Sequence, residues 1–401
     1  MSQLQNFPRR KIALSTSLAL AAARLLSQVC PSRRQPNPPV GSGKGSSKSS
    51  IFRAREILQL AQMKKILIIK TSAIGDVLQT FPVVEALQAR FPGAQIDWLV
   101  EKGCSSLLKA HPGLNRVIEI DTKSWRSALL KRNTWRELAA VCAELRQTHY
   151  DAVFDLQGNT KSALFTLLAK AQEKVGYSRH CVPEWPNLLA TNRKKRVDLN
   201  QNVRSAYLQL VDCHADDNPV LLQLTEDEKA RLETILASKA RVMVAFGSKW
   251  PHKMLSEQTL QQWLAKINVP FLFIYGNNSE KEGAERLSAQ FPGSGAVGEL
   301  TLPLWQALMA QMDYVIAMDS AALHLCGTTN TPSFSVFGPS MASAYKPLGR
   351  QHGHFQGSCP YQRTFAKRCP ILRTCETGAC MKDISADELY IAFTSWQAQR
   401  N

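Results

Sequence analysis

An acidic residue follows the first apolar run of the chain after a short polar turn. Asp76 lies in the segment Lys70–Leu78, and Gly75 before it is expected to allow a tight turn. A carboxylate in this position can remove a proton as a general base. It can equally cap the helix that follows, because the helix dipole favours negative charge in the first turn. The residues alone leave both roles open.

A serine and two lysines follow a second buried run, Val242–Phe246. The segment after it, Gly247–Glu257, contains Ser248, Lys249 and Lys253. A Gly-Ser turn after a strand can offer backbone N–H groups to a phosphate, and the lysines would offset its charge. The alternative is an ordinary polar loop whose Ser256 caps the next helix.

A third polar segment follows the apolar run Tyr314–Met318. Asp319 and Ser320 are expected at a helix N-terminus, where unpaired backbone amides favour a pyrophosphate. His324 falls about one turn later, on the same side as Ser320. A structural histidine is the other reading of that residue.

Alternating strand and helix patterns position these segments. The predicted strands are Lys65–Ile69, Ile96–Val100, Val117–Ile120, Ala152–Asp155, Val242–Phe246, Phe271–Tyr275, Tyr314–Met318 and Ser333–Phe337. The predicted helices are Val77–Arg90, Ser105–Ala110, Trp135–Gln147, Thr160–Lys170, Asn200–Val211, Glu257–Ile267, Glu280–Gln290, Leu304–Met312 and Ala321–Thr328. Repeated strand–helix units predict an α/β protein with parallel sheets and ligands beyond the strands' carboxyl ends.

The length of 401 residues favours two domains, which we place at 63–220 and 221–401. The boundary is expected near Asp216–Leu224. Residues 1–62 carry ten Lys or Arg and one acid, and are predicted to be a disordered extension. An upstream start codon before Met63, a targeting segment and a membrane-touching arm all remain open. No stretch reaches the ~20 unbroken apolar residues of a membrane span.

The net charge of +17 indicates an anionic partner such as a nucleotide, an acidic glycan or a membrane surface. The sequence has no helix-turn-helix, zinc-finger or base-stacking signature, so we expect no nucleic-acid partner. Four of the ten cysteines lie near the C-terminus: Cys359, Cys369, Cys375 and Cys380. Their spacing lacks the tight pair typical of zinc sites, which favours free or redox-responsive thiols over structural zinc. The other six are expected to be buried or free thiols in a reducing compartment.

Taken together, the motifs resemble those of glycosyltransferase family nine, which contains the lipopolysaccharide heptosyltransferases. The sequence from Lys65 to Glu101, KILIIKTSAIGDVLQTFPVVEALQARFPGAQIDWLVE, is similar to the N-terminal signature of the enzymes that add the first heptose. The segments Phe154–Ser162, Gly247–Glu257 and Met318–Leu325 also resemble family motifs, in the family's order. The likeness spans about residues 63–385.

The resemblance implies a GT-B fold of two Rossmann-like domains facing a cleft, with the acceptor bound by 63–220 and the nucleotide sugar by 221–401. It implies an inverting, metal-independent transfer of heptose from ADP-heptose to the anionic Kdo-lipid A inner core. No cofactor is expected. The enzyme would be cytoplasmic and peripheral at the inner face of the cytoplasmic membrane. Another donor sugar, a sugar-nucleotide epimerase and a non-catalytic nucleotide-sugar-binding protein are the alternatives.

The same resemblance implies the residue roles. Asp76 would be the general base and Lys253 would neutralise the leaving diphosphate. The donor would contact Ser248, Lys249, Glu280, Asp319, Ser320, Ala321 and His324, with Glu280 on the ribose hydroxyls. Thr71, Ser72, Gln157 and Lys161 would bind the acceptor. Ala321 departs from the family's glycine, which keeps the non-catalytic alternative open, and Ser256 replaces a proline.

Overall fold

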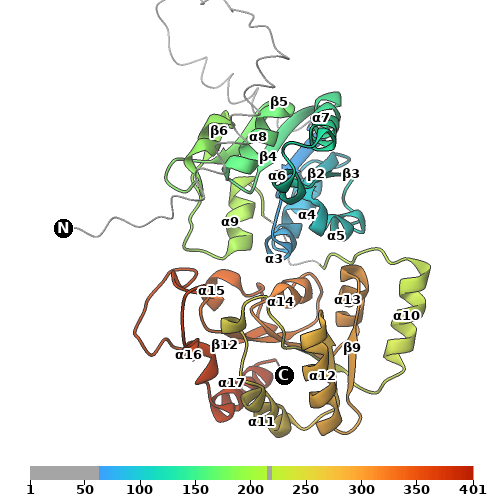
Figure 1. Cartoon of the computed structure of the whole chain (residues 1–401), viewed down its shortest axis with the longest axis vertical. Helices are drawn as coiled ribbons and strands as arrows, with labels where there is room; N and C mark the ends of the chain where they lie inside the picture. Colours follow the sequence, from blue (N-terminus) through green and yellow to red (C-terminus); the bar gives the residue numbers. More distant parts are fainter. Residues whose placement is uncertain (1–62, 215–218, 401) are drawn as a thin grey trace, which may run out of the picture. The chain divides into compact units, whose positions relative to one another are not determined.

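The computed structural model describes residues 63–214 and 219–400, so the predictions for the extension 1–62 and for part of the domain boundary lie outside the described residues. Strands from the first half of the chain form a six-stranded sheet A in the order β3-β2-β1-β4-β5-β6. Its strands are β1 Lys65–Ile69, β2 Gln95–Glu101, β3 Arg116–Ile120, β4 His149–Asp155, β5 Lys170–Tyr177 and β6 Arg193–Lys195. In Figure 1 these elements run from blue to green.

The second sheet B also has six strands, in the order β12-β11-β10-β7-β8-β9. They are β7 Val242–Ala245, β8 Phe271–Tyr275, β9 Gly295–Gly298, β10 Tyr314–Met318, β11 Ser333–Phe337 and β12 His352–Gln356. All of its pairings are parallel, with Ala245 opposite Ala317 across β7 and β10. The predicted α/β class with two parallel sheets is therefore confirmed.

Fourteen of the helices that carry these sheets and loops have these bounds: α3 Ile74–Leu78, α4 Phe81–Arg90, α5 Ser105–Lys109, α6 Thr122–Ser127, α7 Arg132–Gln147, α8 Thr160–Leu168, α9 Val203–Leu210, α10 Glu226–Leu236, α11 Glu257–Ile267, α12 Asn278–Gln290, α13 Leu302–Met309, α14 Ala321–Cys326, α15 Ala342–Tyr345 and α17 Ala386–Ala398. Three short 3₁₀ helices, η1 Lys102–Cys104, η2 Trp185–Leu189 and η3 Pro251–Lys253, and the four-residue α16 Ala379–Lys382 complete the described elements.

Chain contacts group the described residues into two compact units. The first contains 63–70, Gln88–Leu99 and Ile120–Arg196. The second contains Thr71–Leu87, Val100–Glu119 and the described residues from Val197 onward. The predicted domain boundaries stay a prediction. Helix α3, which carries Asp76, belongs to the second unit, as do Lys253 and Asp319.

Burial explains why the central strands form. Ile66, Leu67, Ile68 and Ile69 of β1 are inaccessible to solvent, as expected for a parallel strand covered on both faces. Around sheet B, the aromatic rings of Trp263, Phe334, Phe393 and Trp396 pack against one another across α11, β11 and α17.

The predicted helix Val77–Arg90 is wrong as a single element, because the chain breaks it into α3 and α4 at Gln79–Thr80. Pro82 has no N–H, and its ring would clash with the carbonyl one turn earlier in a continuous helix. In the first turn of α4 a proline is tolerated. The hydroxyl of Thr80 donates to the Asp76 carbonyl at 2.8 Å and so satisfies a backbone group at the break.

The predicted helix Thr160–Lys170 is also too long, since it ends at Leu168 and Lys170 begins β5. Strand β5 was not predicted, because its first part, Lys170–Lys174, is mostly polar and only partly buried. Strands β6, β9 and β12 and helices α6, α10 and α17 were likewise not predicted. These edge and surface elements lack the continuous apolar runs of the central strands.

Candidate active site

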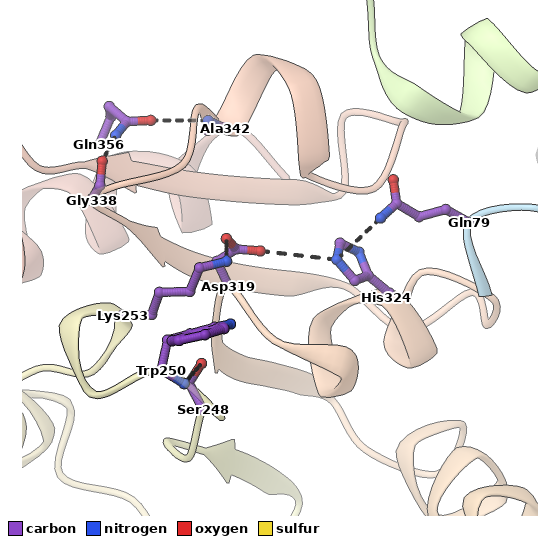
Figure 2. Close-up of polar contacts among 9 residues, drawn as sticks. All are labelled: Gln79, Ser248, Trp250, Lys253, Asp319, His324, Gly338, Ala342 and Gln356. Carbon is purple, nitrogen blue, oxygen red and sulfur yellow. Dashed lines mark hydrogen bonds and ion pairs between the residues drawn. The ribbon is translucent and has the colours of Figure 1, made fainter. Parts of the chain in front are cut away.

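Lys253 and Asp319 meet in the second unit although they are far apart in sequence. Lys253 ends η3, in the loop after β7, and Asp319 follows β10 directly. Because β7 and β10 are parallel neighbours in sheet B, their carboxyl ends lie at the same edge. Nζ of Lys253 donates to Oδ2 of Asp319, as Figure 2 shows. The side chains are only 7% and 5% exposed, so this ion pair is buried.

The carboxyl group of Asp319 keeps its negative charge in this pair. Burial raises the pKa of Asp319, but the charge and hydrogen bond of Lys253 and smaller contributions from His324 and Ser340 together outweigh it, and the pKa lies below its ordinary value. Asp319 is therefore a carboxylate at neutral pH. Such a pair costs desolvation energy and is retained where charge is needed in the site.

His324 lies in α14, with Nε2 at 3.9 Å from Oδ1 of Asp319. Burial lowers the pKa of His324 to about 4, against the opposing charge of Asp319. The ring is thus neutral at pH 7. Its Nε2 lies 3.2 Å from the side-chain nitrogen of Gln79, so the amide donates and the ring proton sits on Nδ1 (Figure 2).

Gly75 has a different role from the expected tight turn. It lies inside α3, its φ is not positive, and it faces α14. A Cβ there would approach Cδ2 of His324 to 2.7 Å, well inside van der Waals contact. The glycine is therefore needed so that α3 and His324 can pack closely. Sequence reasoning missed this contact, and it missed Gln79, because neither leaves a signal in local periodicity.

Asp76 is in the third position of α3 and is half-buried. Its Oδ2 accepts a weak hydrogen bond from the backbone N–H of Ala73 at 3.4 Å. Its negative charge is close enough to His324 to contribute to raising the pKa of that ring against the larger effect of burial. The capping contact and the position near the site are both present in the structure.

The predicted Gly-Ser turn holds Ser248 half-buried and Lys249 exposed. Ser248 Oγ accepts from the backbone N–H of Trp250 at 3.5 Å (Figure 2). Ser256 caps α11 by accepting from the N–H of Thr259 at 3.0 Å, as its alternative reading predicted. Ser320 is the N-cap of α14 and Ala321 its first residue, also as predicted.

Three polar atoms around the ion pair are buried without a hydrogen-bond partner among the described residues: Ser320 Oγ, His324 Nδ1 and Gln79 Oε1. Buried polar atoms are normally paired, and each exception needs an explanation. A polar ligand with hydroxyl or phosphate oxygens could supply the missing partners.

Glu280 lies apart from the ion pair, in the first turn of α12. Its Oε2 accepts from the backbone N–H of Gly276 at 2.7 Å. A Cβ on Gly247 would approach Glu280 Oε1 to 2.4 Å, so the glycine of the predicted turn makes room for this carboxylate. Glu280 borders a cavity of about 190 Å³ whose walls include Phe246, Leu260 and Met318.

Of the four residues predicted to bind the acceptor, Thr71 and Ser72 lie in the second unit, directly before α3. Gln157 and Lys161 lie in the first unit, in the loop after β4 and at the start of α8. Asp155, which ends β4, shapes this loop by accepting from the N–H groups of Gln157 at 3.1 Å and Gly158 at 2.9 Å. The sequence analysis did not single out Asp155.

The four C-terminal cysteines line one cavity of about 240 Å³. All four are free, as are Cys104, Cys142, Cys181, Cys213 and Cys326. None of these nine forms a disulfide, the preference for free or redox-responsive thiols over structural zinc stays a prediction, and Cys30 lies outside the described residues. Within residues 63–214 and 219–400, no three His, Cys, Asp or Glu side chains are arranged to hold a metal ion.

Residues 138–374 match the model of glycosyltransferase family 9 (heptosyltransferase). The chain belongs to this family. It is therefore a glycosyltransferase, and the predicted family is confirmed. The chain is 26% identical to lipopolysaccharide heptosyltransferase 1 of Pseudomonas aeruginosa over 344 residues, covering 84% of this chain and 95% of that protein. It is also 26% identical to lipopolysaccharide heptosyltransferase 1 of Escherichia coli K12, over 69% of this chain and 88% of that protein.

Among solved structures, the chain is similar to E. coli heptosyltransferase WaaC with ADP-2-deoxy-2-fluoro heptose. The TM-score is 0.64 at 22% identity, covering 84% of this chain and 100% of that one. This likeness supports the GT-B fold class of the family. Among the described residues of this glycosyltransferase, no helix is both long and apolar enough to cross a membrane.

Proposed function

We propose that this glycosyltransferase moves heptose from ADP-heptose to the Kdo-lipid A inner core of lipopolysaccharide, with inversion and without a metal. The observation that carries the proposal is the buried pair of Lys253 and Asp319, surrounded by unpartnered polar atoms. The names of the relatives support heptose as the sugar and lipopolysaccharide as the class of molecule it is added to, whereas Kdo-lipid A is inferred from the resemblance of the motifs. The solved WaaC complexes with ADP and a fluorinated ADP-heptose support the donor.

Lys253 would act on the leaving group. As the bond between the anomeric carbon and the phosphate oxygen breaks, negative charge builds on the ADP diphosphate. A fixed ammonium group in a buried site stabilises this charge more strongly than water would. Asp319 holds the ammonium group in place, and Ser320 Oγ is available to donate to a phosphate oxygen.

Asp76 would accept the proton of the acceptor hydroxyl as that oxygen attacks the anomeric carbon. The electrostatic effect of Asp76 on His324 supports a place for its carboxylate beside the donor site. Attack from the face opposite to the leaving diphosphate inverts the anomeric configuration. The neutral His324 and Gln79 would then hydrogen-bond the donor sugar through Nδ1 and Oε1.

The nucleoside of the donor would occupy the cavity beside Glu280. Its volume of about 190 Å³ and its mixed lining, with apolar side chains such as Phe246 and Met318 beside charged ones, suit a purine nucleoside. The Glu280 carboxylate would accept from the ribose hydroxyls. Exposed Lys249 would add positive charge near the phosphates.

Thr71, Ser72, Gln157 and Lys161 would bind the acceptor. We propose that the enzyme is cytoplasmic and peripheral at the inner face of the cytoplasmic membrane, where a lipid-linked acceptor would be reached. The positive net charge of +17 favours both an anionic acceptor and an anionic surface.

The test is a transfer assay with the purified full chain, ADP-heptose and Kdo-lipid A, followed by NMR of the product's anomeric configuration. Transfer with inversion that persists in EDTA is the expected result. UDP-glucose in place of ADP-heptose should give no product. Nucleotide binding without transfer would instead support a non-catalytic protein, and loss of activity in EDTA that manganese restores would contradict the metal-independent step.

A further inference from the structure

Two large apolar side chains stand exposed on the first unit. Trp185 and Leu189, at the two ends of η2, are 70% and 73% exposed. We call these two residues the η2 patch. The neighbouring helix α8, which packs against η2, adds Leu167 at 46% exposure. A surface tryptophan beside surface leucines is unusual unless something covers it.

The η2 patch is held rigidly by a buried side chain between its two members. Asn187 is inaccessible to solvent. Its amide nitrogen donates to Oδ2 of Asp155 at 2.6 Å and to the carbonyl of Asn159 at 3.2 Å. The carboxylate of Glu184 also accepts from the N–H of Thr160 at 2.9 Å. The exposure of Trp185 and Leu189 is thus a fixed feature of the fold.

These contacts connect the η2 patch to the acceptor loop. Asp155, Asn159 and Thr160 belong to the stretch that carries Gln157 and Lys161, the residues expected to bind the acceptor. The η2 patch therefore flanks the acceptor loop within the same unit.

The segment that carries the η2 patch is also rich in basic residues. Residues 178–196 contain five Lys or Arg and one acid, Glu184, which is bound to Thr160. The N–H of Ser178 donates to the carbonyl of Lys195 at 2.7 Å, which brings Arg179 close to the basic run 193–196. Arg179, Lys194 and Arg196 are exposed.

We propose that the η2 patch and these basic residues dock the protein on an anionic phospholipid bilayer. Tryptophan and leucine would enter the headgroup region, and the lysines and arginines would face anionic lipids. The inference rests on the proposed function, because a lipid-anchored acceptor must be reached at the bilayer surface. The excess of basic residues in the segment that carries the η2 patch disfavours a second copy of the chain as the occupant, since like charges would be brought together.

The test is co-sedimentation of the full chain with vesicles of phosphatidylcholine and phosphatidylglycerol at 3:1, and with phosphatidylcholine alone. The variant Trp185→Ser/Leu189→Ser should bind the anionic vesicles about tenfold more weakly, because it removes most of the inserted apolar area. The variant Leu130→Ser/Trp135→Ser is the matched control, since it removes an exposed leucine and tryptophan elsewhere in the same unit. The control should bind like the unchanged protein.

A charge variant, Arg179→Gln/Lys194→Gln, should bind anionic vesicles more weakly than the unchanged protein. Its binding should also depend less on salt concentration. The Trp185→Ser/Leu189→Ser variant and the charge variant should both transfer heptose to a soluble, delipidated acceptor at the unchanged rate. Equal vesicle binding by the Trp185→Ser/Leu189→Ser variant and the unchanged protein would overturn the proposal. So would a dimer in sedimentation that this variant converts to a monomer.

The two proposals fail in different ways. If the Trp185→Ser/Leu189→Ser variant and the charge variant lose vesicle binding, but neither they nor the unchanged protein transfer heptose, the docking surface stands and the proposed function is wrong. If transfer to soluble acceptor occurs and vesicle binding is independent of the η2 patch, the function stands and the surface is wrong.

Discussion

The ammonium group of Lys253 and the carboxylate of Asp319 form a buried ion pair across neighbouring strand ends, 66 positions apart in sequence. The register of β7 and β10 dictates this meeting, because Ala245 and Ala317 are partners just before the two loops leave the sheet. Under the proposed function, a charge pair in this position would offer a preformed cation to the diphosphate.

Replacement of Lys253 tests that role. Lys253→Ala should lower kcat by an amount that corresponds to ~2–4 kcal/mol of transition-state stabilisation. It should also lower the free energy of unfolding by about 3–5 kcal/mol, because Asp319 is left as an unpaired buried charge. Lys253→Ala/Asp319→Ala should recover part of that stability, but not the activity. Steady-state kinetics and urea unfolding measure the two effects separately, and recovery of both would assign Lys253 a purely structural role.

Asp76→Asn tests the general base. The variant keeps the size of the side chain and an oxygen that can accept from the Ala73 N–H, but it removes the basicity of the carboxylate. Turnover should fall ~10²–10⁴-fold while the Kd for ADP stays within about twofold. The assay is single-turnover transfer together with ADP titration. Near-unchanged turnover would leave Asp76 with its capping role alone.

Gly75→Ala tests the close packing of α3 on His324. The added methyl would lie 2.7 Å from Cδ2 of His324, so unfolding free energy should fall by about 1–3 kcal/mol. Gly103→Ala is the control, because a Cβ there meets nothing within 4 Å. The double variant Gly75→Ala/His324→Ala should regain stability relative to Gly75→Ala. A double variant that is no more stable would show that another contact is responsible.

Buried His352 predicts a pH dependence of stability. Burial lowers the pKa of His352 from 6.5 to about 3, while Nδ1 is hydrogen-bonded to Ser333 Oγ at 2.8 Å. The unfolded chain therefore binds a proton below pH 6.5 that the folded protein does not, and stability falls as pH falls from about 6.5 towards 3.

His352→Asn removes this linkage. Below pH 6.5 the linkage removes about 1.4 kcal/mol of unfolding free energy per pH unit. The loss of unfolding free energy between pH 7 and pH 5 should therefore be about 2 kcal/mol smaller in the variant than in the unchanged protein. Urea unfolding at the two pH values measures it. The comparison uses the pH difference within each protein, so a general destabilisation by the substitution does not affect it. An unchanged difference would contradict the buried neutral histidine.

The sequence by itself determined the central architecture. Short, mostly apolar runs such as Lys65–Ile69 and Tyr314–Met318, bounded by polar residues, are typical of strands buried on both faces, and β1, β8, β10 and β11 were predicted with their observed bounds. The polar segments after these runs then had to lie at the carboxyl edges. Local chemistry also sufficed for the Ser256 cap of α11.

Only the tertiary structure decided which of those segments meet. The pairing of Lys253 with Asp319 depends on strand order, which composition and periodicity do not encode. The contact of Gly75 with His324 and the anchoring of η2 by Asn187 are packing relations between distant segments. A local pattern records how one segment buries its own side chains, whereas these contacts are set by the three-dimensional register of two sheets and the helices around them.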